Sequence, residues 1–137
     1  MKYIFANWKM YLNNEESLAL AREVATIVLP DGVIGAIFPT LLSFREVRSI
    51  LEGADFSVGV QNIDCVPKGA YTGAISAVLC QEAGAKYALV GHSERRHIFG
   101  EKDEDVKRKI EACDNAGLIP VVCIGETAED LSNGKRQ

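Results

Sequence analysis

The sequence alternates between short apolar segments and amphipathic segments, and this alternation limits the possible folds more than any other feature. Each apolar segment has the length and β-branched content of a buried strand, and each is followed by residues with helical spacing. The expected strands are KYIFANWK, VIGAIF, DFSVGVQNI, KYALVG and LIPVVCIG, at residues 2–9, 33–38, 55–63, 86–91 and 118–125. The first of them is expected to be buried on both faces. Strands joined by helices in this way form a parallel sheet with helices outside it.

Capping residues and glycines mark the ends of the four connecting helices. Asn13 and Glu16 have the spacing of a capping box, and Pro30 is expected to end the first helix. The next three helices are expected to end at Gly53, Gly84 and Gly117, with Asp103 as the cap of the last one. The inward faces are expected to contain Leu18, Ala21, Ala25 and Val28, then Leu42, Val47, Ile50 and Leu51, and in the fourth helix Val106, Ile110 and Cys113.

Two closures of such a sheet are possible, an open doubly wound sheet or part of a (β/α)8 barrel. A complete barrel needs about 250 residues, whereas this chain has 137, with five strands, four helices and the start of a fifth helix at Thr127 and Asp130. No G-x-G-x-x-G or G-x-x-x-x-G-K-[ST] motif supports a nucleotide-binding sheet. Polar residues instead follow the carboxyl ends of the strands, where a barrel has its active site. We therefore expect an α/β fold, a partial (β/α)8 barrel, as a single incomplete domain over residues 1–137.

Charge and cysteine usage exclude several classes of partner. The net charge is −4 and the basic residues are scattered, which argues against nucleic acid and acidic membranes. No signal peptide or membrane-spanning run is expected. The four cysteines form no C-x-x-C pair, so we expect no metal site and free thiols in the cytoplasm. Cys123 has no activating base near it in the sequence and is expected to pack behind the site.

Asn7 and Lys9 flank Trp8 at the end of the first strand, so both side chains point the same way. On an outer face they would be a solvated polar edge. In a barrel the same direction leads to the mouth, where a desolvated lysine is suited to binding an anion. The residues alone leave both readings open.

The segment LVGHSERRHIFGE places several functional groups directly after a buried strand. A lone histidine such as His92 is more often structural. However, it follows Gly91, which permits close approach of a substrate, and it opens a helical turn, which favours a neutral imidazole that donates a hydrogen bond to a carbonyl. Ser93 fits an N-cap or a first-turn position. Glu94 is either a general base or an ion-pair partner.

The two arginines and the second histidine of this segment have plainer readings. Arg95 and Arg96 are expected in salt bridges or at an interface, and His97 at the surface. No Ser-His-Asp arrangement is present at the strand ends.

The motifs NWKM, QN, GAYTG, GHSERR and CIGE occur in the order and spacing of the triosephosphate isomerase family, which the chain resembles over its whole length. The resemblance implies strands one to five of the barrel. It also implies an isomerase of glycolysis and gluconeogenesis that interconverts dihydroxyacetone phosphate and D-glyceraldehyde 3-phosphate through an enediolate, without a cofactor.

The resemblance also implies roles for individual residues. Asn7 and Lys9 hold the substrate, with Lys9 stabilising phosphate and enediolate charge, and His92 is the electrophile that moves protons between the two oxygens. Three residues support the site: Glu94 as partner of Lys9, Ser93 beside it, and Cys123 as the family's buried cysteine. Thr72 resembles the threonine that enters a neighbouring subunit, and Arg95 belongs to the same interface.

Three positions depart from the family pattern, and the usual dimer contact is expected to be weakened in two places. Ala74 replaces the glutamate that would pair with Arg95 across a dimer, Leu131 replaces an arginine, and Thr40 replaces a proline. A weakened dimer contact is therefore expected.

The family's catalytic glutamate, its lid and its glycine-rich phosphate loops correspond to positions after Gln137. One hypothesis is that this chain is the N-terminal part of a split isomerase, inactive until a separate C-terminal chain completes the barrel. The alternative is a non-catalytic half-barrel that self-associates and has only a structural or interaction role.

Overall fold

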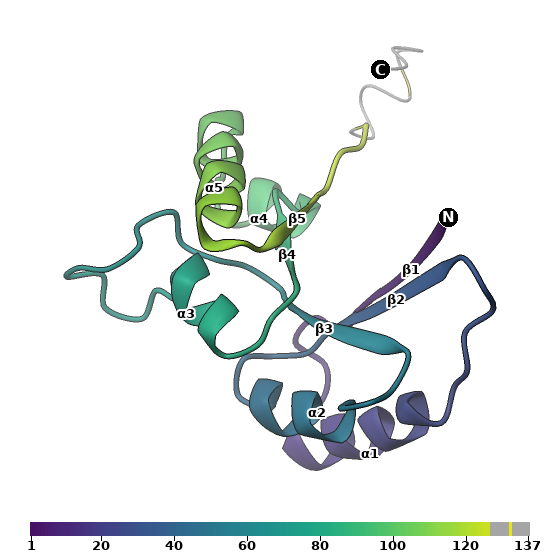
Figure 1. The fold of residues 1–137 in the computed structure, drawn as a ribbon. Coiled ribbons are helices and arrows are strands. Elements are labelled where there is room, and N and C mark those ends of the chain that lie inside the picture. Colours follow the sequence, from purple (N-terminus) through teal and green to yellow (C-terminus); the bar gives the residue numbers. More distant parts are fainter. Residues whose placement is uncertain (127–131, 133–137) are drawn as a thin grey trace.

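The computed structural model describes residues 1–126 and residue 132 and contains one curled sheet of parallel strands (Figure 1). The strands are β1 (Lys2–Asn7), β2 (Val33–Phe38), β3 (Phe56–Val60), β4 (Tyr87–Val90) and β5 (Ile119–Val122). They lie in the order β1-β2-β3-β4-β5, and every neighbouring pair is parallel. Sequence order and spatial order therefore coincide, as in one part of a (β/α)8 barrel. The expected partial barrel is confirmed.

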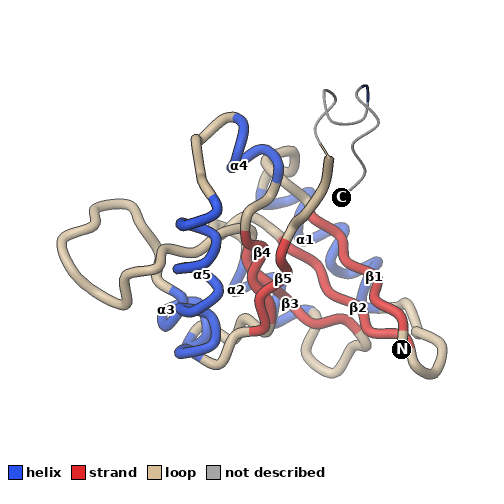
Figure 2. The backbone as a smooth tube through the Cα atoms, turned by 90° about the horizontal axis from the view of Figure 1, so that it is seen from above, coloured by secondary structure: helices blue, strands red, loops and turns tan. Residues whose placement is uncertain are grey.

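The helices are α1 (Asn14–Ala25), α2 (Phe44–Ile50), α3 (Ala77–Glu82), α4 (Ser93–His97) and α5 (Asp103–Ala116), and they lie outside the strands (Figure 2). The short α4 is an additional helical turn between β4 and the long crossover helix α5. A hydrophobic core forms between the helices and one face of the sheet; its fully buried members include Ala21, Ile37, Val47, Cys80, Val90 and Cys113.

The opposite face of the sheet carries a second cluster, which we call the inner-face cluster. It consists of Ala36, Phe38, Tyr87 and Leu89, with Phe5, Ile34, Val121 and Cys123 packed against them. The ring of Phe5 lies 5.8 Å from that of Phe38 and 5.1 Å from that of Tyr87, measured between centroids. In a barrel, side chains on this face fill the interior.

Several expected helix signals are confirmed. Asn13 and Glu16 form both hydrogen bonds of a capping box at the start of α1. Gly117 ends α5 with a φ of 76°, a left-handed conformation that glycine adopts without strain. Lys102 has an extended backbone and directly precedes α5, which begins at Asp103. Lys102 is therefore the N-cap, and the expectation that Asp103 is the cap is wrong.

Two residues expected to face inward are exposed. Val28 lies beyond α1, which ends at Ala25, well before Pro30. Leu42 lies before α2, which begins at Phe44. Both expectations were wrong because the helices are shorter than their apolar periodicity suggested.

The expectation that β1 is buried on both faces is also wrong. Ile4 is 51% exposed and Tyr3 is exposed as well, because β1 pairs with β2 alone among the described strands. The expected start of a fifth helix at Thr127 and Asp130 lies outside the described residues, and so does Leu131, which replaces an arginine of the family pattern.

Candidate active site

A pocket of about 530 Å³ lies at the carboxyl ends of the strands. Its polar wall consists of Asn7, Lys9, Gln61, Asn62, His92, Glu94 and Arg95. Its rim includes the apolar side chains of Met10, Tyr11, Ile98 and Phe99, all of them exposed. The pocket thus collects residues that follow β1, β3 and β4, as expected for the active-site end of barrel strands.

Lys9 has a φ of 54°, a left-handed conformation that non-glycine residues rarely adopt. Three hydrogen bonds hold this turn in place. The Lys9 amide donates to Asn7 Oδ1 at 3.0 Å, and Gln61 Nε2 donates to the carbonyl oxygens of Lys9 and Phe38 at 2.8 and 2.9 Å. The expectation of a desolvated lysine is wrong, because the Lys9 side chain is 39% exposed and lies past the end of β1.

Lys9 and Glu94 form an ion pair, with Nζ 2.8 Å from Oε1. The hydrogen bond to Glu94 raises the pKa of Lys9, and the hydrogen bond from Lys9 lowers the pKa of Glu94. Both groups are therefore charged near neutral pH. A carboxylate with a lowered pKa is a poor proton acceptor, so the geometry favours Glu94 as the partner of Lys9 over Glu94 as a general base.

His92 is the N-cap residue of α4, and its Nδ1 accepts a hydrogen bond from the Glu94 amide at 3.3 Å. A nitrogen that accepts this bond carries no proton, so the proton of a neutral imidazole lies on Nε2. Glu94 Oε2 lies 3.5 Å from the same Nδ1, and this contact is an ion pair only when the imidazole is protonated. In its neutral form with Nδ1 as the acceptor, His92 has an Nε2–H donor, which is suited to hydrogen bonding with a carbonyl.

The two arginines of this segment have partners within the chain. Arg95 Nε donates to Glu101 Oε1, and its guanidinium lies 4.5 Å from the centre of the Phe99 ring. Arg96 Nε donates to the Gly91 carbonyl at 2.7 Å, and its Nη1 lies 2.7 Å from Asp103 Oδ1. Arg96 therefore fixes the turn after β4.

The remaining predicted residues lie outside this pocket. Ser93 and His97 are exposed on α4 and line a neighbouring cavity that also includes Cys123. Burial raises the pKa of Cys123, so its thiol is protonated near neutral pH and packs against the inner-face cluster. Thr72 is exposed in the long loop between β3 and α3, which extends away from the strands and helices (Figure 1).

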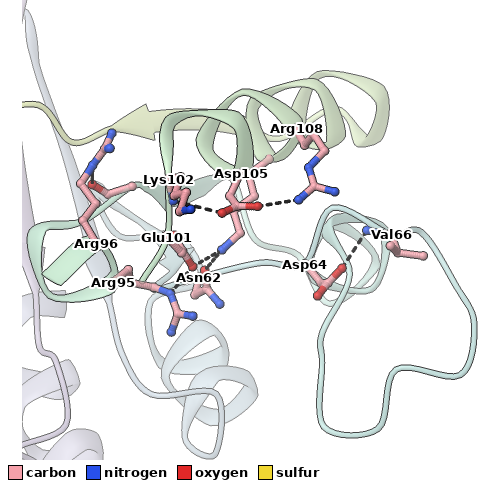
Figure 3. Close-up of polar contacts among 11 residues, drawn as sticks. Asn62, Asp64, Val66, Arg95, Arg96, Glu101, Lys102, Asp105 and Arg108 are labelled. Atoms are coloured by element: carbon pink, nitrogen blue, oxygen red, sulfur yellow. Dashed lines mark hydrogen bonds and ion pairs between the residues drawn. The ribbon is translucent and has the colours of Figure 1, made fainter. Parts of the chain in front are cut away.

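Sequence reasoning missed a polar network beside the pocket, formed by Asn62, Arg95, Glu101 and Lys109. We call these four residues the Glu101 cluster. Figure 3 shows Asn62, Arg95 and Glu101 of this network close together. A sequence signal for it existed. Lys109 falls three residues after Val106 and four before Cys113, on the buried face of α5, where a lysine needs a buried partner.

Two other kinds of feature are absent from the described residues. They contain no group of three or more histidine, cysteine, aspartate or glutamate side chains able to hold a metal ion. Over the same part of the chain, no helix is both long and apolar enough to cross a membrane. The four cysteines are free thiols, and burial raises the pKa of Cys80 and of Cys113 to about 11.

Curled parallel strands in sequence order, with a polar pocket at their carboxyl ends, place the chain in the (β/α)8-barrel class. Within that class, the sequence model of triosephosphate isomerase matches residues 2–137. The chain belongs to the triosephosphate isomerase family.

Curated relatives and a solved structure agree with this assignment. The chain is 37% identical over 132 residues to triosephosphate isomerase from Thermoanaerobacter pseudethanolicus and 42% identical over 133 residues to one from Pseudomonas putida. Each match covers 96% of this chain and 53% of the relative. The crystal structure of triosephosphate isomerase from Bartonella henselae matches 97% of this chain with a TM-score of 0.88 and 35% identity, and 55% of that chain is covered. The chain therefore spans about half the length of the curated relatives it matches.

Proposed function

We propose that this chain is the N-terminal part of a triosephosphate isomerase. Completed by a C-terminal part that supplies a catalytic glutamate, it interconverts dihydroxyacetone phosphate and D-glyceraldehyde 3-phosphate in cytoplasmic glycolysis and gluconeogenesis. The observation that carries the proposal is one pocket, in a chain of this family, that holds the Lys9–Glu94 ion pair together with His92, whose Nδ1 accepts from the Glu94 amide.

In the proposed reaction, His92 Nε2–H donates a hydrogen bond to the substrate carbonyl oxygen. The glutamate removes the proton from the neighbouring carbon, and the electron pair moves onto that oxygen to give an enediolate. A neutral histidine electrophile is the established pattern of this family. The proton of one oxygen passes to the other through His92, and the glutamate returns its proton to the adjacent carbon.

Lys9 and Asn7 bind the substrate in this scheme. The Lys9 ammonium, fixed by Glu94, is a point charge for the phosphate and for the negative charge that develops on the enediolate. Asn7 lines the same pocket, and its Oδ1 also accepts a hydrogen bond from the backbone N–H of Lys9. Ser93 and Cys123 support the site from outside the pocket.

We further propose that Thr72 and Arg95 belong to an interface between copies of the chain, which makes a homo-oligomer possible. Ala74 offers Arg95 no carboxylate, and Glu101 of the same chain already accepts from Arg95 Nε. The contact between copies is therefore proposed to be weak.

The deciding experiment is an isomerase assay of the pure chain, of a polypeptide carrying strands six to eight, and of their mixture. We expect no turnover from either alone and turnover from the mixture, because the proton-abstracting glutamate and His92 are then in one barrel. Activity of the pure chain would rule out the need for a completing part. Inactivity of a mixture that forms a stable complex would rule out the proposed isomerase activity.

A second candidate function rests on the exposed apolar side chains of β1 and on the single pairing partner of β1 and of β5 among the described strands. Such edges pair readily with other strands, so a self-associating half-barrel with only an interaction role is the alternative. Light scattering of the pure chain separates the two functions. A stable homo-oligomer that does not bind strands six to eight would favour the alternative.

A further inference from the structure

The Glu101 cluster links four elements of the fold to the wall of the pocket. Asn62 follows β3, Arg95 lies on α4, Glu101 lies between α4 and α5, and Lys109 lies on α5. Asn62 and Arg95 line the pocket, whereas Glu101 and Lys109 are not among its lining residues. The cluster therefore connects a buried charge to two side chains that an occupant of the pocket would meet.

Lys109 and Glu101 are the buried members of the cluster, with side chains 10% and 9% exposed. Lys109 Nζ lies 2.5 Å from Glu101 Oε1, which also accepts from Arg95 Nε. Burial raises the pKa of Glu101, but the hydrogen bonds from Lys109 and Arg95 outweigh it, so the net pKa lies below its ordinary value. Within the described chain, Glu101 Oε2 has no hydrogen-bond partner. The charged carboxylate thus depends on the two cations at its other oxygen.

Lys109 also determines how Asn62 is oriented. Its Nζ donates to Asn62 Oδ1 at 2.6 Å, across 47 positions of sequence. An ammonium group has donors only, so Asn62 must turn its oxygen toward Lys109, and its Nδ2 hydrogens are left to point elsewhere. A neutral group at position 109 would remove this constraint.

We infer that Lys109 is a positioning residue for the candidate pocket: its buried ammonium fixes the Asn62 amide directly and the Arg95 guanidinium through Glu101. Among the described residues, the cluster shares no hydrogen bond or ion pair with Lys9, Glu94 or His92. Lys109 therefore organises the wall that carries Asn62 and Arg95 and leaves the Lys9–Glu94 pair and His92 unchanged.

The first test needs no substitution. In ¹H–¹⁵N NMR of the full chain, the protons of a buried ammonium group that donates two hydrogen bonds exchange slowly with water. We expect the Lys109 Nζ protons to give a signal at neutral pH that persists when the signals of exposed lysines are lost, with a nuclear Overhauser contact to Asn62. Absence of that signal, or of that contact, would overturn the inference.

The second test compares Lys109→Met with Lys107→Met, a matched control at an exposed lysine of the same helix. The side-chain amide signals of Asn62 and the Nε–H signal of Arg95 are expected to shift in K109M and to stay in place in K107M. Folded K109M with unshifted Asn62 and Arg95 signals contradicts the inference. If circular dichroism shows that K109M is unfolded, the measurement on the unsubstituted chain decides the question.

A third test rests on the proposed function and uses the completed isomerase. Loss of one oriented hydrogen bond is worth about 1 kcal/mol, so K109M should raise KM about fivefold, whereas kcat should change less than about twofold. Lys109→Arg keeps the positive charge and should therefore raise KM less than K109M does. An unchanged KM, or a loss confined to kcat, would overturn the role at the pocket. If the completed protein is no isomerase, the two NMR tests still stand.

Discussion

Lys9 has an unusual backbone conformation for a residue that follows a strand, and this conformation marks the pocket. Left-handed backbone costs a non-glycine residue roughly 1–2 kcal/mol, and here the hydrogen bonds of Asn7 and Gln61 maintain it. Strained residues of this kind cluster at functional sites. The turn places the ammonium against Glu94 rather than in water beyond the sheet edge.

His92 and His97, at the start and the end of the segment GHSERRH, give a matched comparison. His92 presents its Nε2–H at the pocket, whereas His97 is exposed on α4. In the completed enzyme, His92→Gln should lower kcat by about 10²–10⁴-fold, the usual contribution of a positioned acid–base group, and His97→Gln should leave it unchanged. Steady-state kinetics check this, and equal effects of the two substitutions would remove His92 from the mechanism.

The lowered pKa of Glu101 predicts how stability depends on pH. The Glu101 carboxylate binds its proton less readily in the folded chain than in the unfolded chain. The contribution of this carboxylate to the free energy of unfolding is therefore complete at pH values above its pKa in the unfolded chain, ordinarily about 4.3. The contribution is lost as the pH falls through the lower pKa that Glu101 has in the folded chain. Glu101→Gln should be less stable than the unsubstituted chain at pH 7, and the difference should shrink below about pH 4.3.

Urea unfolding at several pH values measures this difference. Glu104→Gln is the control, because Glu104 is an exposed carboxylate in the first turn of α5. A stability difference for E101Q that stays constant from pH 7 to pH 3 would mean that the charge of Glu101 does not stabilise the fold.

At the scale of elements, β3 can pack closely beside β2 and β4 because Gly59 has no side chain. A Cβ on Gly59 would overlap the ring of Phe38 and would lie 2.9 Å from the carbonyl oxygen of Tyr87. Phe38 and Tyr87 both belong to the inner-face cluster. The absence of a side chain at Gly59 thus leaves space for the Phe38 ring and for the close approach of the Tyr87 backbone.

Gly59→Ala is therefore expected to destabilise the chain by about 1–3 kcal/mol, the usual cost of overpacking a rigid core. Gly125→Ala is the control, because a Cβ there meets no atom within 4 Å and its φ is not left-handed. Denaturant unfolding gives both values. Similar stability of the two variants would show that the inner-face cluster adapts to the added methyl group.

The elements themselves were largely predictable from local sequence. VIGAIF forms β2 over its whole predicted length, and the capping box of Asn13 and Glu16 marks the start of α1. Local patterns failed where tertiary packing decides. Val28 and Leu42 continue the apolar periodicity but lie outside the helices, and Ile4 is exposed because β1 has one described neighbour.

The site was predictable only in part, for a related reason. Motifs identified Lys9, His92 and Glu94, and Glu94 accepts from a lysine that is far from it in the sequence. The left-handed φ of Lys9 has no local signal, because such positions usually carry glycine or asparagine. The bond between Lys109 and Asn62 joins segments that only the barrel topology brings together.

At the scale of the whole molecule, the curled sheet has two strands with a single described neighbour, β1 and β5. Exposed apolar side chains lie along both, including Tyr3, Ile4, Ile119 and Val122. The proposed C-terminal part would add strands beside each of them and close the barrel. The same surfaces explain why self-association is the alternative to completion.

Hydrogen exchange tests this picture at both edges at once. Amides of β1 and β5 that face away from their described neighbours are open to water, whereas amides of β3 are paired on both sides. Addition of a polypeptide carrying strands six to eight should slow exchange in β1 and β5 by at least about tenfold and should change β3 little. Closure requires both edges to respond, because the added strands must pair with β1 at one end and with β5 at the other. Protection of one edge alone would indicate an open sheet, and protection of both edges in the pure chain as its concentration rises would indicate pairing between copies.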